Sequence, residues 1–273
     1  MPKPVLDSVH VYPVKSVAGS APGEALVEPW GLAEDRRWTL VDSSAKVVTQ
    51  RQQPRLALTR AEPLTGGGIR LTAPGQAPLT VAVPDPVDTV VTDVFGDKVE
   101  AVPAGEAVDA WFSDYLGAQV RLVHLDDPAV RRPMDPKFAR PGETVHFGDA
   151  MPLLVAALAS LDALNSLIAQ GDHPDDGPLP MNRFRPNVVV DGTAPWAEDD
   201  WTRVVIGEVA FRVTKPCGRC VITTTDQRTA ERGKEPLRTL ARHRRFGDRL
   251  VFGQYLVPER TGVIRVGDAV TVG

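Results

Sequence analysis

Cysteine is scarce in this chain, with two among 273 residues, Cys217 and Cys220. Two cysteines cannot build the disulfide framework that holds many small secreted domains together. The chain also lacks any apolar run of about 18 residues, so we expect no transmembrane helix. Residues 1–16 lack the apolar segment of a signal peptide, and we therefore expect a cytoplasmic protein.

An excess of charge of one sign is also missing. The chain has 31 Lys and Arg against 35 Asp and Glu, a formal net charge of −4. That balance gives no overall attraction to nucleic acid or to an anionic membrane, so we expect neither as a partner. With 42% hydrophobic and 24% charged residues, the composition is that of a folded globular protein. Its length allows one large domain or two ordinary ones.

Twenty-five prolines and 23 glycines separate many short apolar runs, a pattern that predicts numerous strands and few helices. The fold class that we expect is mostly β (α+β), with the strand spacing of barrels or sandwiches and a few peripheral helices. The chain divides best near residue 120 into two β-rich halves. Strands are expected at 8–14, 38–42, 47–51, 57–61, 69–72, 79–83, 98–102, 120–125, 187–190, 203–206, 209–215, 220–225, 252–257 and 263–265.

Three segments are predicted to be helical. Residues 106–117 place Val108, Trp111, Phe112 and Tyr115 on one face. Residues 160–171 have Ser160 as a candidate N-cap, and residues 235–246 form a basic third helix that we expect to be mainly solvated. Long loops are expected at 126–143 and 172–181, and long loops in compact proteins are usually functional or mobile.

The segment "KPCGRCVITTTD" (215–226) contains both cysteines and allows four interpretations. A structural zinc site needs four ligands, but the chain has no second cysteine pair, and His243 lies far along it. A dithiol redox pair normally opens a helix, whereas "CVITTTD" is predicted to be a strand. The cysteines could be buried without a chemical role. Alternatively, a single thiolate, favoured by Lys215 and Arg219, could bind a soft metal that belongs to an anionic cofactor.

The same segment, together with several others, resembles proteins with a molybdenum cofactor sulfurase C-terminal (MOSC) domain. "VYPVKSVAG" (11–19), "WGLAEDRRWTLVD" (30–42) and "VVTQRQQPRLAL" (47–58) resemble the N-terminal β-barrel domain of such proteins, which we expect to span 1–120. "MPLLVAALASLDALNSLI" (151–168), "RFRPNVVVDG" (183–192) and the cysteine segment resemble the MOSC domain, expected at 121–273. The resemblance implies two β-barrel-like domains, as in the amidoxime reducing components of mitochondria and their bacterial relatives.

The resemblance also implies a molybdenum cofactor, in which a phosphate-bearing pterin holds the metal through its dithiolene. Cys220 matches the cysteine that binds molybdenum and is the implied catalytic residue, whereas the role of Cys217 stays open. The implied cofactor-binding residues are Lys15, Ser16, Arg36, Arg185, Gly218, Arg219 and Tyr255. Arginine suits a phosphate and a polar pterin because it donates bidentate, charge-assisted hydrogen bonds. Ala156 and Ala157 depart from the family, in which small hydroxyl residues lie near the cofactor.

By this resemblance the chain reduces small N-hydroxylated compounds, such as amidoximes and N-hydroxylated bases, by oxygen-atom transfer. It has too few cysteines for a four-cysteine iron–sulfur cluster, so its electrons would come from a separate ferredoxin or flavoprotein. Arg131 and Arg132 are candidates for the rim of the substrate pocket, and we expect a monomer. Two alternatives remain: a sulfur carrier with a persulfide on Cys220, and a protein that carries the cofactor without turnover. The family is also associated with pyridoxal phosphate, for which we find no site in this sequence.

Overall fold

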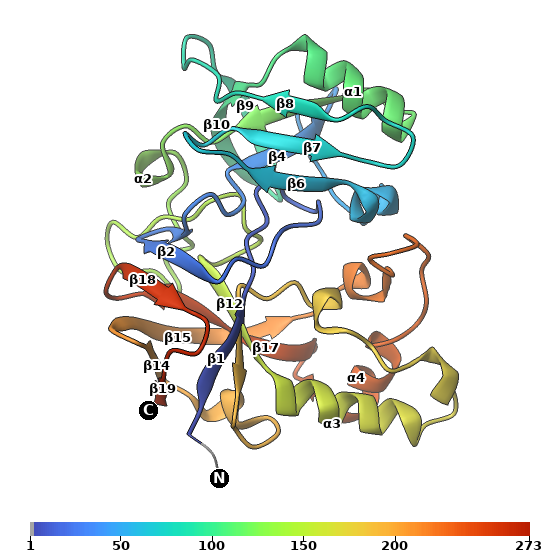
Figure 1. Ribbon diagram of the computed structural model, residues 1–273, viewed down its shortest axis with the longest axis vertical. Helices are drawn as coiled ribbons and strands as arrows, with labels where there is room; N and C mark the ends of the chain where they lie inside the picture. Colours follow the sequence, from blue (N-terminus) through green and yellow to red (C-terminus); the bar gives the residue numbers. More distant parts are fainter. Residues whose placement is uncertain (1–2) are drawn as a thin grey trace.

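The computed structural model describes residues 3–273, which form many short strands and four α-helices. Figure 1 shows two bodies, one with β4, β6–β10 and α1, the other with β1, β12, β15, β17, α3 and α4. The expectation of a mostly β fold with two barrel-like domains and peripheral helices is confirmed. No helix within residues 3–273 combines the length and the apolar character needed to cross a bilayer.

The largest sheet is a nearly closed barrel with the strand order β1–β13–β12–β17–β15–β14–β19, and β16 pairs with β17. Hydrogen bonds from Leu6 N to Asp268 O (2.9 Å) and from Gly267 N to Leu6 O (2.8 Å) join its two edges. Its interior is filled by buried apolar side chains, as in a barrel core. The strands are β1 Val5–Val9, β12 Leu153–Ala157, β13 Val188–Asp191, β14 Arg203–Ile206, β15 Val209–Gly218, β16 Arg245–Phe246, β17 Arg249–Pro258 and β19 Val270–Val272.

The other strands form three smaller sheets, with the orders β5–β4–β11–β10–β9, β6–β7–β8 and β18–β2–β3. The first two belong to the N-terminal body, whose core includes Trp38, Leu40, Ile69 and Phe112. The strands are β2 Glu24–Glu28, β3 Gly31–Leu32, β4 Trp38–Asp42, β5 Val47–Val48, β6 Arg60–Pro63, β7 Ile69–Thr72, β8 Leu79–Val81, β9 Val90–Val94, β10 Asp97–Pro103, β11 Val120–His124 and β18 Gly262–Arg265.

The helices are α1 Glu106–Leu116, α2 Pro128–Arg131, α3 Leu158–Ala169 and α4 Leu237–His243. The predicted inward face of α1 is confirmed, because all four of its apolar residues are buried. The prediction of Ser160 as the N-cap of α3 is wrong, because the helix begins at Leu158. The Ser160 hydroxyl instead donates to Glu198 Oε2 at 2.7 Å and accepts from Trp196 N at 2.8 Å. The predicted loop 126–143 contains the short helix α2.

The prediction of a strand at 220–225 is also wrong. This segment forms the 3₁₀ helix η5, Val221–Thr224, which begins directly after Cys220. The hydroxyl of Thr223 donates to Cys220 O at 2.9 Å, and the hydroxyl of Thr224 donates to Val221 O at 2.8 Å. Threonine side chains that bond to preceding carbonyls stabilise a turn despite their β propensity, which explains the error.

Other predicted strands differ in extent. The strand expected at 8–14 is β1, which ends at Val9, and the strand expected at 47–51 is limited to β5. The segment 57–61 begins inside the 3₁₀ helix η1, Pro54–Leu58, and ends in β6. Sequence patterns did not indicate β2, β3, β9, β12, β16 or β19. The helix expected at 235–246 is shorter, because α4 ends at His243 and residues 245–246 form β16.

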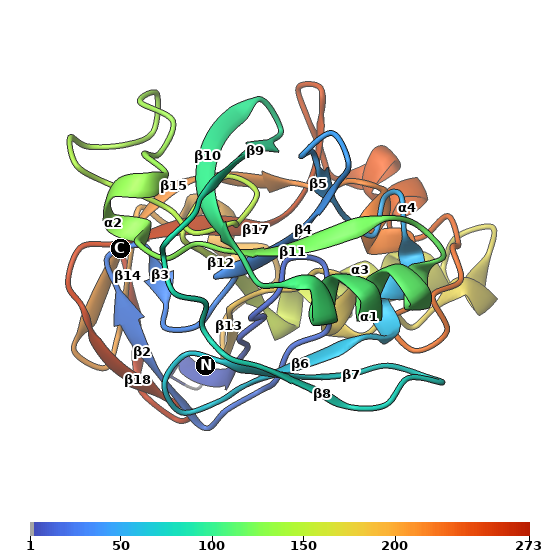
Figure 2. The ribbon, with the colours of Figure 1, turned by 90° about the horizontal axis from the view of Figure 1, so that it is seen from above.

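Strands pair across residue 120 in both directions. From the N-terminal half, β1 pairs with β13 and β2 pairs with β18, whereas β11 pairs with β4 and β10. The chain therefore crosses between the two bodies more than once, and Figure 2 shows the molecule from above, with one body lying over the other. The division of the chain at residue 120 stays a prediction.

Candidate functional site

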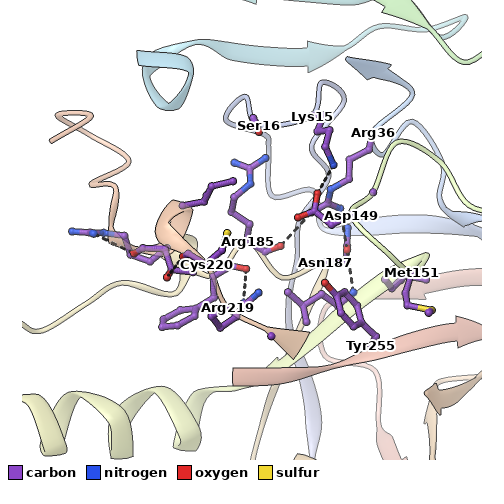
Figure 3. A pocket seen from close by; sticks show the side chains of 18 residues that line it. Lys15, Ser16, Arg36, Asp149, Met151, Arg185, Asn187, Arg219, Cys220 and Tyr255 are labelled. Atoms are coloured by element: carbon purple, nitrogen blue, oxygen red, sulfur yellow. Dashed lines mark hydrogen bonds and ion pairs between the residues drawn. The ribbon is translucent and has the colours of Figure 1, made fainter. Parts of the chain in front are cut away.

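A pocket that is open to solvent lies between the barrel and segments of the N-terminal half. Figure 3 shows its lining side chains converging from both parts of the chain. All eight residues singled out from the sequence line it: Lys15, Ser16, Arg36, Arg185, Gly218, Arg219, Cys220 and Tyr255. They come from five separated segments, so only the tertiary fold brings them together.

Lys15 is buried at the inner wall of the pocket. Its Nζ donates to Phe147 O at 2.8 Å and forms an ion pair with Asp149. Burial lowers the pKa of Lys15 to about 8, an effect that the Asp149 carboxylate only partly reverses. The ammonium group of Lys15 could therefore bind a further anion in the pocket, in addition to the carboxylate of Asp149.

Arg36 is held by the fully buried carboxylate of Asp35, with which it forms an ion pair. Asp35 also accepts hydrogen bonds from Tyr12 N at 2.8 Å and from Asn187 Nδ2 at 3.0 Å. Burial alone would raise the pKa of Asp35, but Arg36 and the hydrogen-bond donors lower it to about 2. This network fixes the guanidinium of Arg36 at the pocket wall.

Two guanidinium groups contact the ring of Tyr12, with Arg185 Cζ 4.2 Å and Arg36 Cζ 4.8 Å from its centroid. The Tyr12 hydroxyl donates to Pro186 O at 3.1 Å, and Arg185 Nη2 donates to Val17 O at 2.8 Å. Burial lowers the pKa of Arg185 to about 10, and the charge of Arg36 adds to the effect. The attraction of both guanidinium groups to the ring of Tyr12 offsets the repulsion between them only in part.

Backbone strain is concentrated at this pocket. Ser16, Arg36 and Arg185 have φ angles of 66°, 48° and 52°, in the left-handed region that non-glycine residues seldom adopt. Such conformations cost on the order of 1–3 kcal/mol each and persist where the surrounding structure imposes them. Three such residues at one pocket indicate that the backbone geometry there is kept for binding a ligand, because it lowers the stability of the fold.

The two cysteines occupy different environments. Cys217 is 1% exposed at the end of β15, where its Sγ accepts from Arg219 Nη1 at 2.9 Å, and burial raises its pKa. Cys220 lines the pocket, and its Sγ lies 3.3 Å from Arg51 Nη2. Arg219 also donates to Phe184 O at 2.7 Å. The fold therefore presents the thiol of Cys220 to the pocket.

Sequence reasoning missed several residues of the site. Arg183, Asp149 and Asn187 line the pocket, Tyr12 contacts Arg36, and Arg51 contacts Cys220. Tyr12, Arg51, Arg183 and Asn187 lie inside the segments that carried the family resemblance, which was their only signal. Asp149 precedes the matched segment 151–168 and had no sequence signal.

Two expectations about neighbouring residues are wrong. Arg131 pairs with Glu100 and Asp126, and Arg132 is buried with hydrogen bonds to His146 O at 2.8 Å and Gly148 O. Neither lines the pocket, because both hold the 126–143 segment in place. Ala156 and Ala157 are fully buried in β12 and do not reach the pocket either.

The donors and charges suit a phosphate-bearing anion next to a metal. Among the described residues that line the pocket, Lys15, Arg36, Arg183, Arg185 and Arg219 are cationic, against the single carboxylate of Asp149. The Nε atoms of Arg183 and Arg219 are buried without a hydrogen-bond partner. Within residues 3–273 no three His, Cys, Asp or Glu side chains cluster to hold a metal. A metal bound by Cys220 would therefore take its other ligands from a cofactor, and the residues present fit the molybdenum cofactor.

Comparison with known domain families agrees with this architecture. Residues 3–119 match the MOSC N-terminal beta barrel domain, and residues 142–271 match the MOSC domain. The two matches together include most of the chain, and they follow each other in the order expected from the sequence. The chain belongs to the MOSC family.

Similar curated proteins fall into two groups. The chain is 34% identical to mitochondrial amidoxime-reducing component 1 of Homo sapiens over 279 residues, 95% of this chain and 80% of that protein. The Xenopus laevis protein of the same name is 32% identical, with 97% and 81% of the two chains covered. Molybdenum cofactor sulfurase of Danio rerio is 33% identical over 92% of this chain but only 31% of that protein.

Proposed function

We propose that the protein is a molybdenum-cofactor-dependent oxidoreductase that reduces small N-hydroxylated compounds by oxygen-atom transfer. The observation that carries the proposal is the convergence of five cationic side chains and one accessible thiol on a single pocket. Relatives named as amidoxime-reducing components span nearly the whole chain and support the substrate class.

The basic residues would hold the cofactor. Arg36, Arg183, Arg185 and Arg219 present charge-assisted donors for a phosphate and a pterin, and Lys15 adds a compact cation. Gly218 leaves backbone accessible at the pocket, and the ring of Tyr255 offers an apolar surface with a hydroxyl. Cys220 would complete the metal coordination. When bound, this group supplies the two-electron chemistry that removes an oxygen atom from an N–O bond.

The overall reaction consumes two electrons and two protons and converts an N–OH group into N–H and water. The chain's own residues bind and orient the reactants, since the fixed cations around Lys15 and Arg36 define where negative charge is stabilised. The electrons would come from a separate ferredoxin or flavoprotein. At the basic helix α4, Arg242 pairs with Asp172 and Arg244 with Asp199, and docking of an acidic electron donor at this helix stays a secondary option.

A sulfur carrier is the second candidate function. The relative named molybdenum cofactor sulfurase and the accessible Cys220 favour it, because a pocket-facing thiol could carry a persulfide. A carrier of the intact cofactor, without turnover, would use the same pocket. These candidates differ from the reductase in whether purified protein turns over an amidoxime.

Metal and pterin analysis of protein from a host that makes the cofactor tests the proposal. We expect near-stoichiometric molybdenum and pterin in the wild type, loss of metal in Cys220→Ser, and retention of both in the matched control Cys217→Ser. The wild type should then reduce benzamidoxime with an artificial electron donor such as reduced methyl viologen. Metal-free wild-type protein with a persulfide on Cys220 would instead establish the carrier.

A further inference from the structure

Phe95 is an exposed aromatic residue at the tip of the hairpin formed by β9 and β10. Val94 and Asp97 are paired, so the turn has two residues, Phe95 and Gly96, with φ angles of 57° and 104°. Two-residue hairpin turns of this conformation favour Asn, Asp or Gly at the first position. A bulky residue with positive φ is a structural outlier, and 52% of Phe95 is exposed. Neither turn geometry nor core packing accounts for a phenylalanine here.

The hairpin places this ring beside the pocket. The centroid of Phe95 is 5.1 Å from Lys15 Nζ and 4.9 Å from Arg51 Cζ. Lys15 lines the pocket, and Arg51 Nη2 lies 3.3 Å from Cys220 Sγ. One side chain therefore separates the ring from the thiol. Figure 2 shows the β9–β10 hairpin standing beside β5, the strand that precedes Arg51.

The two cations hold the ring in position, because cations are attracted to the faces of aromatic rings. About half of the Phe95 surface is exposed to solvent, and Phe95 lies next to a residue that lines the pocket, Lys15, without lining the pocket itself. A planar, conjugated molecule that approached Cys220 could stack on that surface, whereas an aliphatic molecule of the same polarity could not. Offset stacking of this kind changes a binding constant by about two- to tenfold.

We infer that Phe95 is a specificity-determining residue that makes the site prefer aryl over alkyl N-hydroxylated substrates by stacking on their planar rings. This inference rests on the proposed function for the substrate class, but the stacking itself does not require turnover. Phe95 is not itself a proposed cofactor-binding residue, although its ring contacts Lys15, which is one, and the stacking contact would be made to the substrate. Its loss should therefore change substrate affinity and leave the chemical step intact.

Binding and kinetics of benzamidoxime and acetamidoxime test the inference, with holoprotein of wild type, Phe95→Ala and Phe95→Tyr. Phe246→Ala is the matched control, because Phe246 is 46% exposed and its ring centroid lies 4.9 Å from Arg244 Cζ, a cation that does not line the pocket. We expect Phe95→Ala to weaken benzamidoxime binding by calorimetry, and to raise its KM, about fivefold. Its kcat and the values for acetamidoxime should not change. Phe95→Tyr should restore binding, and Phe246→Ala should behave as wild type.

The outcomes separate this inference from the proposed function. If the wild type reduces benzamidoxime and Phe95→Ala leaves the preference between the two compounds unchanged, the inference is overturned and the reductase stands. An equal loss for both compounds would also overturn it. If the wild type reduces neither compound yet binds benzamidoxime in a Phe95-dependent way, the reductase fails and the stacking surface stands. Absence of benzamidoxime binding by the wild type would overturn the inference.

Discussion

Replacement of Asp35 by Asn should destabilise the protein by about 3–5 kcal/mol at pH 7, as expected for breaking a buried ion pair. All the groups that face this carboxylate are donors: the Tyr12 N–H, Asn187 Nδ2, the guanidinium of Arg36 and His146 Nε2, at 3.1 Å. An asparagine NH₂ group at this position would point a donor at other donors. The variant would also leave Arg36 without its counter-charge.

The charge part of this effect follows from the pKa of Asp35. It falls from 3.8 to about 2 on folding, and one pKa unit corresponds to about 1.4 kcal/mol, so ionisation contributes about 2 kcal/mol. Since the folded pKa is depressed, this stability is complete above about pH 5 and is lost progressively as the pH falls through 3.8 and below about 2. The difference between wild type and variant should therefore shrink by about 1 kcal/mol between pH 6 and pH 3.

Urea unfolding at pH 7, 6, 4 and 3 measures these differences, with the exposed Asp88→Asn as a control that should stay within about 0.5 kcal/mol of wild type. A loss below 1 kcal/mol at pH 7, or a difference that does not change down to pH 3, would refute the reasoning. Pterin content should fall in Asp35→Asn as well, because Arg36 loses the group that orients it.

Three further predictions concern the same pocket. Because the pKa of Lys15 is about 8, its charge is present at pH 7 and lost at pH 9, where pterin affinity should be about tenfold weaker in wild type but unchanged in Lys15→Arg; equal pH dependence of the two proteins by gel filtration would contradict this. Tyr12→Phe should cost about 1 kcal/mol in urea unfolding, since it loses one hydrogen bond but keeps the ring under Arg36 and Arg185, whereas Tyr12→Ala should cost about 3–5 kcal/mol; similar costs would argue against the ring contacts. Iodoacetamide should label Cys220 and not Cys217 in cofactor-free protein, because Cys217 is 1% exposed and its pKa is raised, and peptide mass spectrometry showing equal labelling would exclude that difference.

Local patterns in the sequence were sufficient for much of the fold. The apolar face of α1 and the strands near 38–42, 69–72 and 203–206 lie where periodicity predicts them, because each depends on neighbours a few residues away. Two of the strands that were missed, β3 and β12, have a different character. β3 has two residues, and β12 is buried at every position, so neither shows an alternating pattern.

In the segment after Cys220, β propensity fails to predict the secondary structure. Its β-branched residues predict a strand, but hydroxyl groups bonded to preceding carbonyls make a 3₁₀ turn, which sets Cys220 at its start. That turn also separates the environments of the two cysteines. The sequence motif alone did not reveal which environment each thiol would occupy.

The sequence by itself determined the mostly β class, the inward face of α1 and, through family resemblance, eight of the residues that line the pocket. Only the tertiary structure decided that Cys220 faces the pocket while Cys217 is buried, that Asp35 and Tyr12 hold the arginines, and that Arg131 and Arg132 point elsewhere. The physical reason is distance along the chain. Hydrogen bonds join Arg36 to Asn187 and Arg51 to Cys220 across long stretches of chain, and no local pattern records such contacts.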